Sequence, residues 1–409
     1  MIFQFSGKNA VISDENPEEA TFNPKNFTVS QAVNSRDYNV ALSRWEDGNF
    51  MVWNRLIPQQ NDEDLVIAFA EESLNRSVYS SAVSAINRSF SNGSYKSSVF
   101  LGQLDQAYRS MTTEDQETLN RLSSLIRGNS TDFLLESGAF DFLNSRGQTG
   151  LSDDALKLVS SLSTEAVTLD LVPGILEGYL YWSSLDLNGV NPFAHLIDQS
   201  IAKISECLYI SQDKNRVFEV NDNSINTILN IRLAEELSEW AGSRQDDTWG
   251  GVARSIILSV LGLENFTGTI RGEYLLSPEG DITENQASAS LSTGLIYTML
   301  HLGTYEPKAL ALGAGPNPAW IWTAGQDVKA SMNGTILDIS MTFPVGETHY
   351  LILRGIRPFS KIQLYNMDYR SDPQFERYDS SGWTYRAADQ TLLVKMKHKT
   401  QEEHIKIYF

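Results

Sequence analysis

The chain has 409 residues, 41% of them hydrophobic and 20% charged, which is the balance of an ordinary globular protein of two or three domains. Its formal net charge of −19 argues against a nucleic-acid partner, because phosphate binding requires a basic surface. An acidic surface suits a neutral polymer such as a glycan, or simply keeps the protein soluble.

The first 36 residues are predicted to form an N-terminal extension with a short strand. Ile2, Phe3 and Phe5 begin this strand, and Pro17 and Pro24 interrupt the acidic loop that follows. The start lacks the basic and the long apolar regions of a signal peptide. No stretch approaches eighteen consecutive apolar residues, so we expect no membrane span.

Residues 37–313 are predicted to form an α-helical domain. The clearest helix covers 222–240, where apolar residues recur at spacings of three and four. Further helices are expected at 62–75, 76–89, 96–110, 119–126, 130–144, 152–162, 173–184, 193–208, 250–263 and 291–300. So many helices in a row need a shared core, as in an α/α toroid or a stacked-pair array. The absence of a fixed sequence repeat favours the toroid-like arrangement.

The pattern changes near Gly313 and Pro318, because glycine and proline do not continue a helix. Strands are expected at 336–341, 350–354, 361–365, 391–397 and 404–409, with a turn at Asn333 and Gly334. Six to eight short strands with regular turns predict an all-β sandwich domain at 314–409. The predicted fold class is therefore multidomain α + β, an α/α toroid-like helical domain followed by a β-sandwich.

Two segments combine carboxylates with tryptophans, as a sugar site does. An aromatic ring stacks on the C–H face of a sugar, and a carboxylate binds hydroxyl groups or moves a proton. Trp45 and Asp47 stand together in one segment, and Asp247 and Trp249 in another. We expect Trp45, Asp47 and Trp249 to bind substrate and Asp247 to serve as a base. The alternatives are a helix turn at Asp47 and a capping loop at Asp247.

Glu177 lies in an apolar and aromatic run with Tyr181 and Trp182. Burial would raise the pKa of this carboxyl group, which is how a general acid arises from a glutamate. The sequence therefore predicts Glu177 as a catalytic acid, with Tyr181 and Trp182 binding the sugar. Equally open is a glutamate at the solvent edge of a helix that core aromatics flank.

Asp222 belongs to a polar cluster just before the helix predicted at 222–240. Such a cluster first of all caps the helix. At the open end of a toroid it would also face a pocket, so Asp222 is a second candidate for the catalytic base.

The segment from Glu136 to Asp141 resembles the Glu-Ser-Gly-Trp-Asp motif of trehalase-type enzymes. Ala139 and Phe140 stand where that motif has a single tryptophan, which moves Asp141 by one position. The row of helices, the Trp-rich loops and the terminal sandwich also resemble the helical-toroid glycoside hydrolases, which include trehalase-like and glucoamylase-like enzymes. The resemblance implies a glycoside hydrolase with Glu136 at the substrate.

Residues 344–409 are similar to uncharacterised proteins of spirochaete bacteria, most clearly at 368–370 and, just before this stretch, at 343–347. This similarity implies a periplasmic or envelope setting rather than a cytoplasmic one.

The sequence predicts no metal site and no cofactor. The five histidines are scattered and form no ligand pair, and no glycine-rich phosphate-binding motif or GxSxG elbow is present. The single cysteine, Cys207, lies in an apolar helical run and is expected to be a buried structural thiol.

These observations support three hypotheses, each with an oligo- or polysaccharide as partner. The first is an inverting glycoside hydrolase with Glu177 as acid and Asp222 or Asp247 as base. The second is a non-catalytic carbohydrate-binding or scaffold protein of the cell envelope. The third is a polysaccharide lyase, which requires a tyrosine or histidine base. The oligomeric state stays open.

Overall fold

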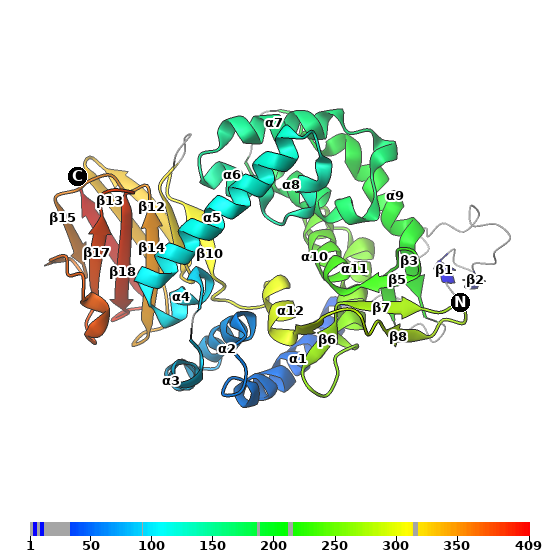
Figure 1. Ribbon diagram of the computed structural model, residues 1–409, viewed down its shortest axis with the longest axis horizontal. Coiled ribbons are helices and arrows are strands. Elements are labelled where there is room, and N and C mark those ends of the chain that lie inside the picture. Colours follow the sequence, from blue (N-terminus) through cyan, green and yellow to red (C-terminus); the bar gives the residue numbers. More distant parts are fainter. Residues whose placement is uncertain are drawn as a thin grey trace. The chain divides into compact units, whose positions relative to one another are not determined.

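The structure is a computed structural model that describes residues 33–91, 93–185, 189–211, 216–313 and 318–409, together with the strands at 3–5 and 9–11. The chain divides into two compact units (Figure 1). Unit 1 comprises Met1–Val52, Leu122–Asp141 and Leu151–Leu300. Unit 2 comprises Trp53–Arg121, Phe142–Gly150 and His301–Phe409.

The α-helices precede the sandwich in the chain. They are α1 (Ser35–Leu56), α2 (Glu63–Asn75), α3 (Tyr79–Ser89), α4 (Tyr95–Leu101), α5 (Leu104–Arg127), α6 (Ala139–Ser145), α7 (Thr149–Ser161), α8 (Val172–Ser184), α9 (Ile197–Cys207), α10 (Thr227–Arg244), α11 (Asp247–Leu261) and α12 (Thr293–Met299). Short 3-10 helices add η2 (Thr131–Leu135), η3 (Thr164–Ala166), η4 (Leu169–Leu171), η5 (Ala194–Leu196) and η6 (Phe375–Arg377). None of the helices in the described ranges is long and apolar enough to cross a membrane.

Unit 1 also contains short antiparallel strands, and all but β1 and β2 lie inside the region 37–313 that was predicted to be helical. They pair as β1 (Phe3–Phe5) with β2 (Asn9–Val11), β3 (Leu208–Ile210) with β4 (Val217–Glu219), β6 (Thr269–Arg271) with β9 (Ser290–Ser292), and β7 (Glu273–Leu276) between β5 (Ser224–Asn226) and β8 (Ile282–Glu284). Strands of three or four residues are too short to show an alternating pattern, which is why the sequence did not predict β3 to β9.

Several predicted helices have different limits in the structure, among them those expected at 119–126, which is part of α5, and at 130–144, which divides into η2 and α6. The helix expected at 222–240 begins only at Thr227, because Ser224–Asn226 pairs with Glu273–Leu276 as β5. The Asn226 side chain caps it and accepts a hydrogen bond from the Leu229 N–H at 3.0 Å. The helix expected at 96–110 is interrupted at Gly102, whose φ of +73° ends α4 before α5 begins.

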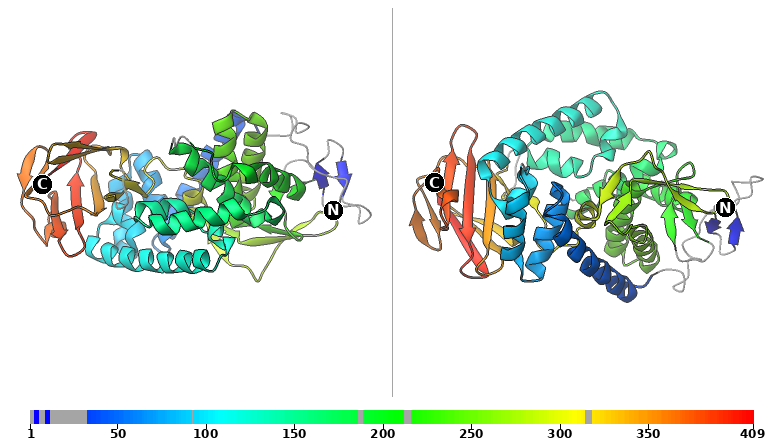
Figure 2. Two further views of the ribbon diagram at one scale, coloured as in Figure 1. Left: turned by 90° about the horizontal axis from the view of Figure 1, so that it is seen from above. Right: turned by 60° about the horizontal axis from the view of Figure 1, so that its bottom comes forward.

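Unit 2 contains a β-sandwich of two five-stranded antiparallel sheets, seen as separate layers in Figure 2. One sheet has the order β10 (Lys308–Ala311), β11 (Trp320–Thr323), β14 (Thr348–Arg354), β18 (Thr391–Lys397), β17 (Gly382–Arg386). The other has the order β12 (Gln326–Asn333), β13 (Ile336–Thr342), β19 (Glu402–Tyr408), β15 (Lys361–Leu364), β16 (Met367–Tyr369). The predicted fold class, helices followed by an all-β sandwich, is confirmed.

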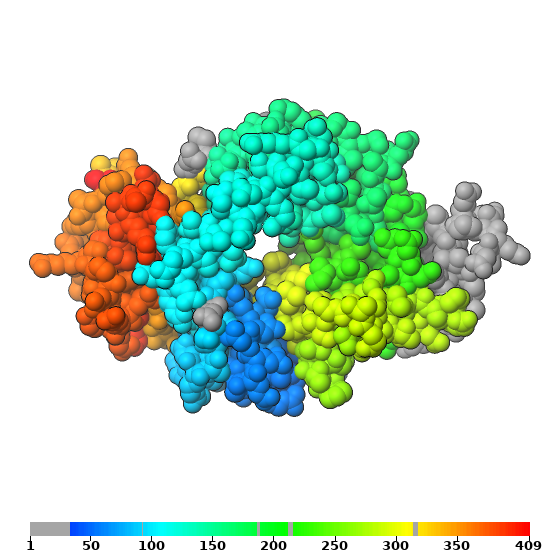
Figure 3. Space-filling model, viewed as in Figure 1, coloured from blue at the N-terminus to red at the C-terminus, as the bar shows by residue number. Residues whose placement is uncertain are grey.

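The first sheet is covered on both faces. Leu351 and Leu353 of β14 point into the core between the two sheets, whereas Ile352 packs against Leu104 and Met111 of α5 on the opposite face. This double burial explains why the sequence of β14 is a continuous apolar run rather than an alternation. In the space-filling view the residues of α4 lie against the orange-to-red strands of the same unit (Figure 3).

Helices α2 to α4 and most of α5 therefore belong to the same compact unit as the sandwich. The domain limits 1–36, 37–313 and 314–409 remain predictions of the sequence. The strand predicted at Phe3 is present as β1, whereas Ile2 and the loop with Pro17 and Pro24 lie outside the described residues.

Candidate functional site

The candidate site lies in unit 1, where close packing holds helix α8 beside η2. Pro173 occupies the first turn of α8, where it leaves no hydrogen bond unmade. Next to it, a Cβ atom on Gly174 would lie only 2.0 Å from the Leu134 carbonyl oxygen. Only a glycine allows this approach, which brings Glu177, one turn further along α8, to the loop after η2.

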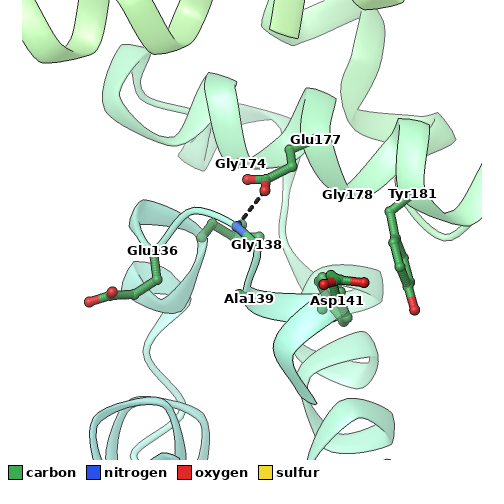
Figure 4. A pocket seen from close by; sticks show the side chains of 10 residues that line it. Glu136, Gly138, Ala139, Asp141, Gly174, Glu177, Gly178 and Tyr181 are labelled. Atoms are coloured by element: carbon green, nitrogen blue, oxygen red, sulfur yellow. Dashed lines mark hydrogen bonds between the residues drawn. The ribbon is translucent and has the colours of Figure 1, made fainter. Parts of the chain in front are cut away.

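Both carboxylate oxygens of Glu177 accept hydrogen bonds. Oε1 accepts a short bond from the backbone N–H of Gly138, toward which the side chain points in Figure 4. Oε2 accepts one from Arg232 at 2.7 Å, in an ion pair whose side chains are 24% and 13% exposed. Glu177 is thus a half-buried carboxylate with a defined orientation.

Arg232 connects three segments of unit 1. It projects from α10 and donates to the Leu135 and Leu134 carbonyl oxygens at 2.6 and 3.3 Å, as well as to Glu177. These bonds bind the end of η2 to α8 and α10. Arg232 therefore fixes the position of the Glu177 carboxylate.

Glu236 lies one turn after Arg232 on α10 and therefore on the same helix face. Burial and the negative charge of Glu177 raise the pKa of Glu236 to about 9, although Arg232 opposes the shift. At neutral pH this half-buried group is a carboxylic acid with a proton to donate. We refer to Glu177, Arg232 and Glu236 as the Glu177 cluster.

A small cavity adjoins this cluster and brings several sequence-predicted residues together. Its volume is about 40 Å³, and its polar lining comes from Glu136, Asp141, Glu177 and Tyr181. In Figure 4 the carboxylate of Glu136 points away from Glu177. The cavity has room for about three water molecules, since each occupies roughly 10–15 Å³ by this measure.

Trp182 lies beside these residues in an aromatic cluster. Its ring meets Phe140 edge-on at 6.0 Å and Tyr181 at 5.7 Å. Of the predicted sugar-binding aromatics, Tyr181 and Trp182 are therefore close to Glu177.

The two predicted bases, like Glu236, are not among the residues that line the cavity. Asp222 lies in the turn between Asn221 and Ser224 with a φ of +48°, and it is exposed. Asp247 is the exposed first residue of α11, and the preceding Asp246 caps that helix. Asp222 therefore belongs to the turn before β5 and Asp247 to the first turn of α11, and their catalytic roles stay predictions.

The remaining predicted sugar-binding residues also lie outside this cavity. Trp249 is only 4% exposed and belongs to the core side of α11. Trp45 is half-buried and Asp47 exposed, both on α1. Their binding roles stay predictions.

Cys207 ends α9 and is half-buried. Burial raises the pKa of its thiol to about 12, with a contribution from the charge of Glu219. Such a thiol is protonated at neutral pH and is a poor nucleophile.

Sequence reasoning missed the roles of Arg232 and Glu236. Both were visible only as polar residues between the apolar positions of α10. Their spacing of four placed them on one face, but nothing in the sequence linked that face to Glu177, 55 residues earlier than Arg232.

Comparisons with known proteins add little to this geometry. No protein-family model and no curated protein matches the chain. Among solved structures, it is similar to a GH127 β-L-arabinofuranosidase from Geobacillus stearothermophilus T6 at a TM-score of 0.19 and 9% identity, over 94% of this chain and 75% of that one. A TM-score this low carries no argument about activity. The resemblance of 344–409 to spirochaete proteins stays a prediction.

In the described ranges, no group of three or more His, Cys, Asp and Glu side chains is arranged to hold a metal ion.

Proposed function

We propose that this protein is carbohydrate-active and that it hydrolyses a glycosidic bond with Glu236 as general acid and Glu177 as general base. One observation carries the proposal. Two carboxyl groups of the Glu177 cluster lie in different environments: Glu177 accepts hydrogen bonds from Arg232 and Gly138, whereas burial raises the pKa of Glu236 to about 9. Two carboxyl groups whose environments differ in this way are what glycoside hydrolysis requires.

The chemical step uses one water molecule. Glu236 gives its proton to the glycosidic oxygen as the bond from that oxygen to the anomeric carbon breaks. Glu177 takes a proton from the water whose oxygen bonds to the same carbon. The cavity beside Glu177 has room for this water but not for a sugar. Its volume of about 40 Å³ is far below the roughly 300 Å³ of the smaller ligand pockets.

The sequence predicted Glu177 as the general acid, whereas the proposed mechanism assigns this role to Glu236. Both oxygens of Glu177 accept hydrogen bonds, one of them from the Arg232 guanidinium, as those of an ionised carboxylate do. Arg232 is a positioning residue for it. Asp222 and Asp247 have no part in the proposed mechanism.

Replacement of each carboxyl group by its amide tests the proposal. Glu177→Gln and Glu236→Gln should each lower turnover by about 100-fold or more. The matched controls Asp222→Asn and Asp247→Asn in the same unit should retain it. Turnover is measured as new reducing ends from maltohexaose, cellohexaose and xylohexaose. The wild-type rate should fall above pH 9, where Glu236 loses its proton.

Other outcomes separate the alternatives. Loss of turnover in Asp222→Asn or Asp247→Asn, but not in Glu236→Gln, would return the catalytic role to the residues that the sequence indicated. Binding of the oligosaccharides without any turnover favours a non-catalytic carbohydrate-binding protein. Growth of ultraviolet absorbance on polygalacturonate, from an unsaturated product, would identify a lyase instead.

A further inference from the structure

A second and larger pocket lies wholly within unit 2. Its volume is about 470 Å³, within the range of small-molecule sites. The charged side chains of its lining are Asp115, Arg146, Arg354 and Asp389. They come from α5, the residue after α6, the end of β14 and the turn between β17 and β18. We call it the Arg354 pocket.

Arg146 and Trp320 form a rigid part of the pocket wall. The Arg146 guanidinium lies over the Trp320 ring at 3.6 Å. It also donates to Asp115 at 3.2 and 3.4 Å and to the Ser145 hydroxyl at 3.0 Å. All three of its nitrogens thus have protein partners, so Arg146 shapes the pocket rather than waiting for a ligand.

Arg354 contrasts with Arg146 because its contacts are few and long. Among the described residues, only one of its terminal nitrogens approaches acceptors, at 3.7 Å from Asp115 and 3.5 Å from the Thr112 hydroxyl, and the guanidinium lies 6.0 Å from the centre of the Tyr108 ring. Its side chain is nevertheless only 21% exposed, and burial lowers the pKa of the guanidinium despite the charge of Asp115. Arg354 therefore has unused donors that water reaches poorly.

Asp389 presents unused acceptors to the same pocket. Its Oδ1 atom is shielded from solvent and meets no hydrogen-bond donor among the residues that the structure describes. An unpaired acceptor of this kind is unfavourable unless a ligand or bound water completes it. The pocket thus holds an underused donor and an underused acceptor, with the amides of Gln116 and Gln390 in the same lining.

We propose that the Arg354 pocket binds a neutral saccharide. Each hydroxyl group both accepts and donates a hydrogen bond, so neighbouring hydroxyls serve Arg354 and Asp389 together. An anionic ligand would meet the carboxylates of Asp115 and Asp389, and a cationic one would meet both arginines. The choice of a saccharide among polyhydroxy compounds rests on the proposed function. The binding site rests on the pocket alone.

Calorimetric titration of the full chain tests this site. The protein carries Glu236→Gln to suppress turnover, and the probes are maltohexaose, cellohexaose and xylohexaose, with trigalacturonate as the anionic probe. At least one neutral probe should bind. Arg354→Gln and Asp389→Asn should each weaken that binding by about tenfold or more, because each removes the charge that strengthens a hydrogen bond to the ligand.

Matched controls in the same unit are Arg357→Gln and Asp379→Asn, which replace exposed residues outside the pocket lining and should leave binding unchanged. Thermal unfolding of each variant by circular dichroism establishes that it is folded. If both pocket substitutions leave the number of binding sites and their affinities unchanged, or if no neutral probe binds, the proposal is overturned. Trigalacturonate binding that Asp389→Asn strengthens would overturn it in favour of an anion site.

Failure of this proposal and failure of the proposed function are distinguishable. Hydrolysis of the oligosaccharides by the wild-type protein tests the proposed function, and it is measured independently of the effect of Arg354→Gln on binding. Saccharide binding that depends on Arg354, without any hydrolysis, supports the pocket and sinks the glycosidase proposal.

Discussion

Each compact unit contains an arginine beside a carboxylate, yet the two arginines differ in how completely they are bonded. Arg232 in unit 1 makes three bonds of 2.6 to 3.3 Å. Arg354 in unit 2 makes two contacts of 3.5 and 3.7 Å at the edge of a pocket. The difference teaches that an arginine with several short bonds holds neighbouring segments together, even though the Nε of Arg232 meets no acceptor among the described residues, whereas a half-buried arginine with only long contacts is suited to bind a ligand.

The largest expected effect concerns the packing that positions Glu177. Gly174→Val would force a Cβ atom to within 2.0 Å of the Leu134 carbonyl oxygen. We expect a loss of about 3–5 kcal/mol in the free energy of unfolding, measured by urea denaturation. The control is Gly242→Ala on α10, where a Cβ meets nothing within 4 Å and helix propensity predicts a gain of about 1 kcal/mol. Equal stability of the two variants would contradict the close packing of α8.

The second test compares the two arginines directly. Arg232→Met removes three bonds and leaves Glu177 half-buried and without its ion pair, so we expect a loss of about 2–3 kcal/mol in the free energy of unfolding. Arg354→Met removes only long contacts and should change it by less than about 1 kcal/mol. Urea denaturation measures both. A larger loss for Arg354→Met than for Arg232→Met would invalidate the comparison.

The third test uses the pH dependence of unit 1. The folded-state pKa of Glu236 is about 9, above the ordinary value of 4.5, so the folded state retains a proton that the unfolded state has released. The resulting stability is fully present below pH 4.5 and is lost as the pH rises through 9. Between pH 5 and pH 9, the free energy of unfolding of Glu236→Gln should fall by about 1–2 kcal/mol less than that of the wild type, after allowance for the partial exposure of Glu236. An unchanged pH profile would show that Glu236 is not protonated.

The smallest expected effect concerns a buried histidine of unit 2, whose contribution to stability changes with pH in the opposite direction. His349 is fully buried, stacks on Phe343 at 4.4 Å and shares a 2.9 Å hydrogen bond with the Thr323 hydroxyl. Burial and the neighbouring His398 lower the pKa of His349 below 6.5. The stability that neutral His349 contributes to the folded state is therefore present above pH 6.5 and is lost as the pH falls. His349→Gln should lessen the acid-induced loss between pH 7 and pH 5.5 by about 1 kcal/mol. Parallel profiles of variant and wild type would count against a neutral His349.

The sequence by itself determined the fold class and the identity of Glu177 as an unusual residue. Apolar spacings of three and four, and the alternation after Gly313, depend on local geometry, so helices and sandwich strands could be predicted. Short strands such as Ser224–Asn226 could not, because they are held by pairing with Glu273–Leu276 rather than by a pattern of their own.

Only the tertiary structure decided which charged groups meet. Arg232 reaches Glu177 across 55 residues of sequence, and Arg354 shares the pocket lining with Asp115, which is 239 positions earlier. Asp222 and Asp247 looked equally suitable in sequence but are exposed, Asp222 in the turn before β5 and Asp247 at the start of α11. Hydrogen bonding and burial of a charge depend on distances between segments that local periodicity does not encode, so a candidate site emerges only once the helices and strands have packed.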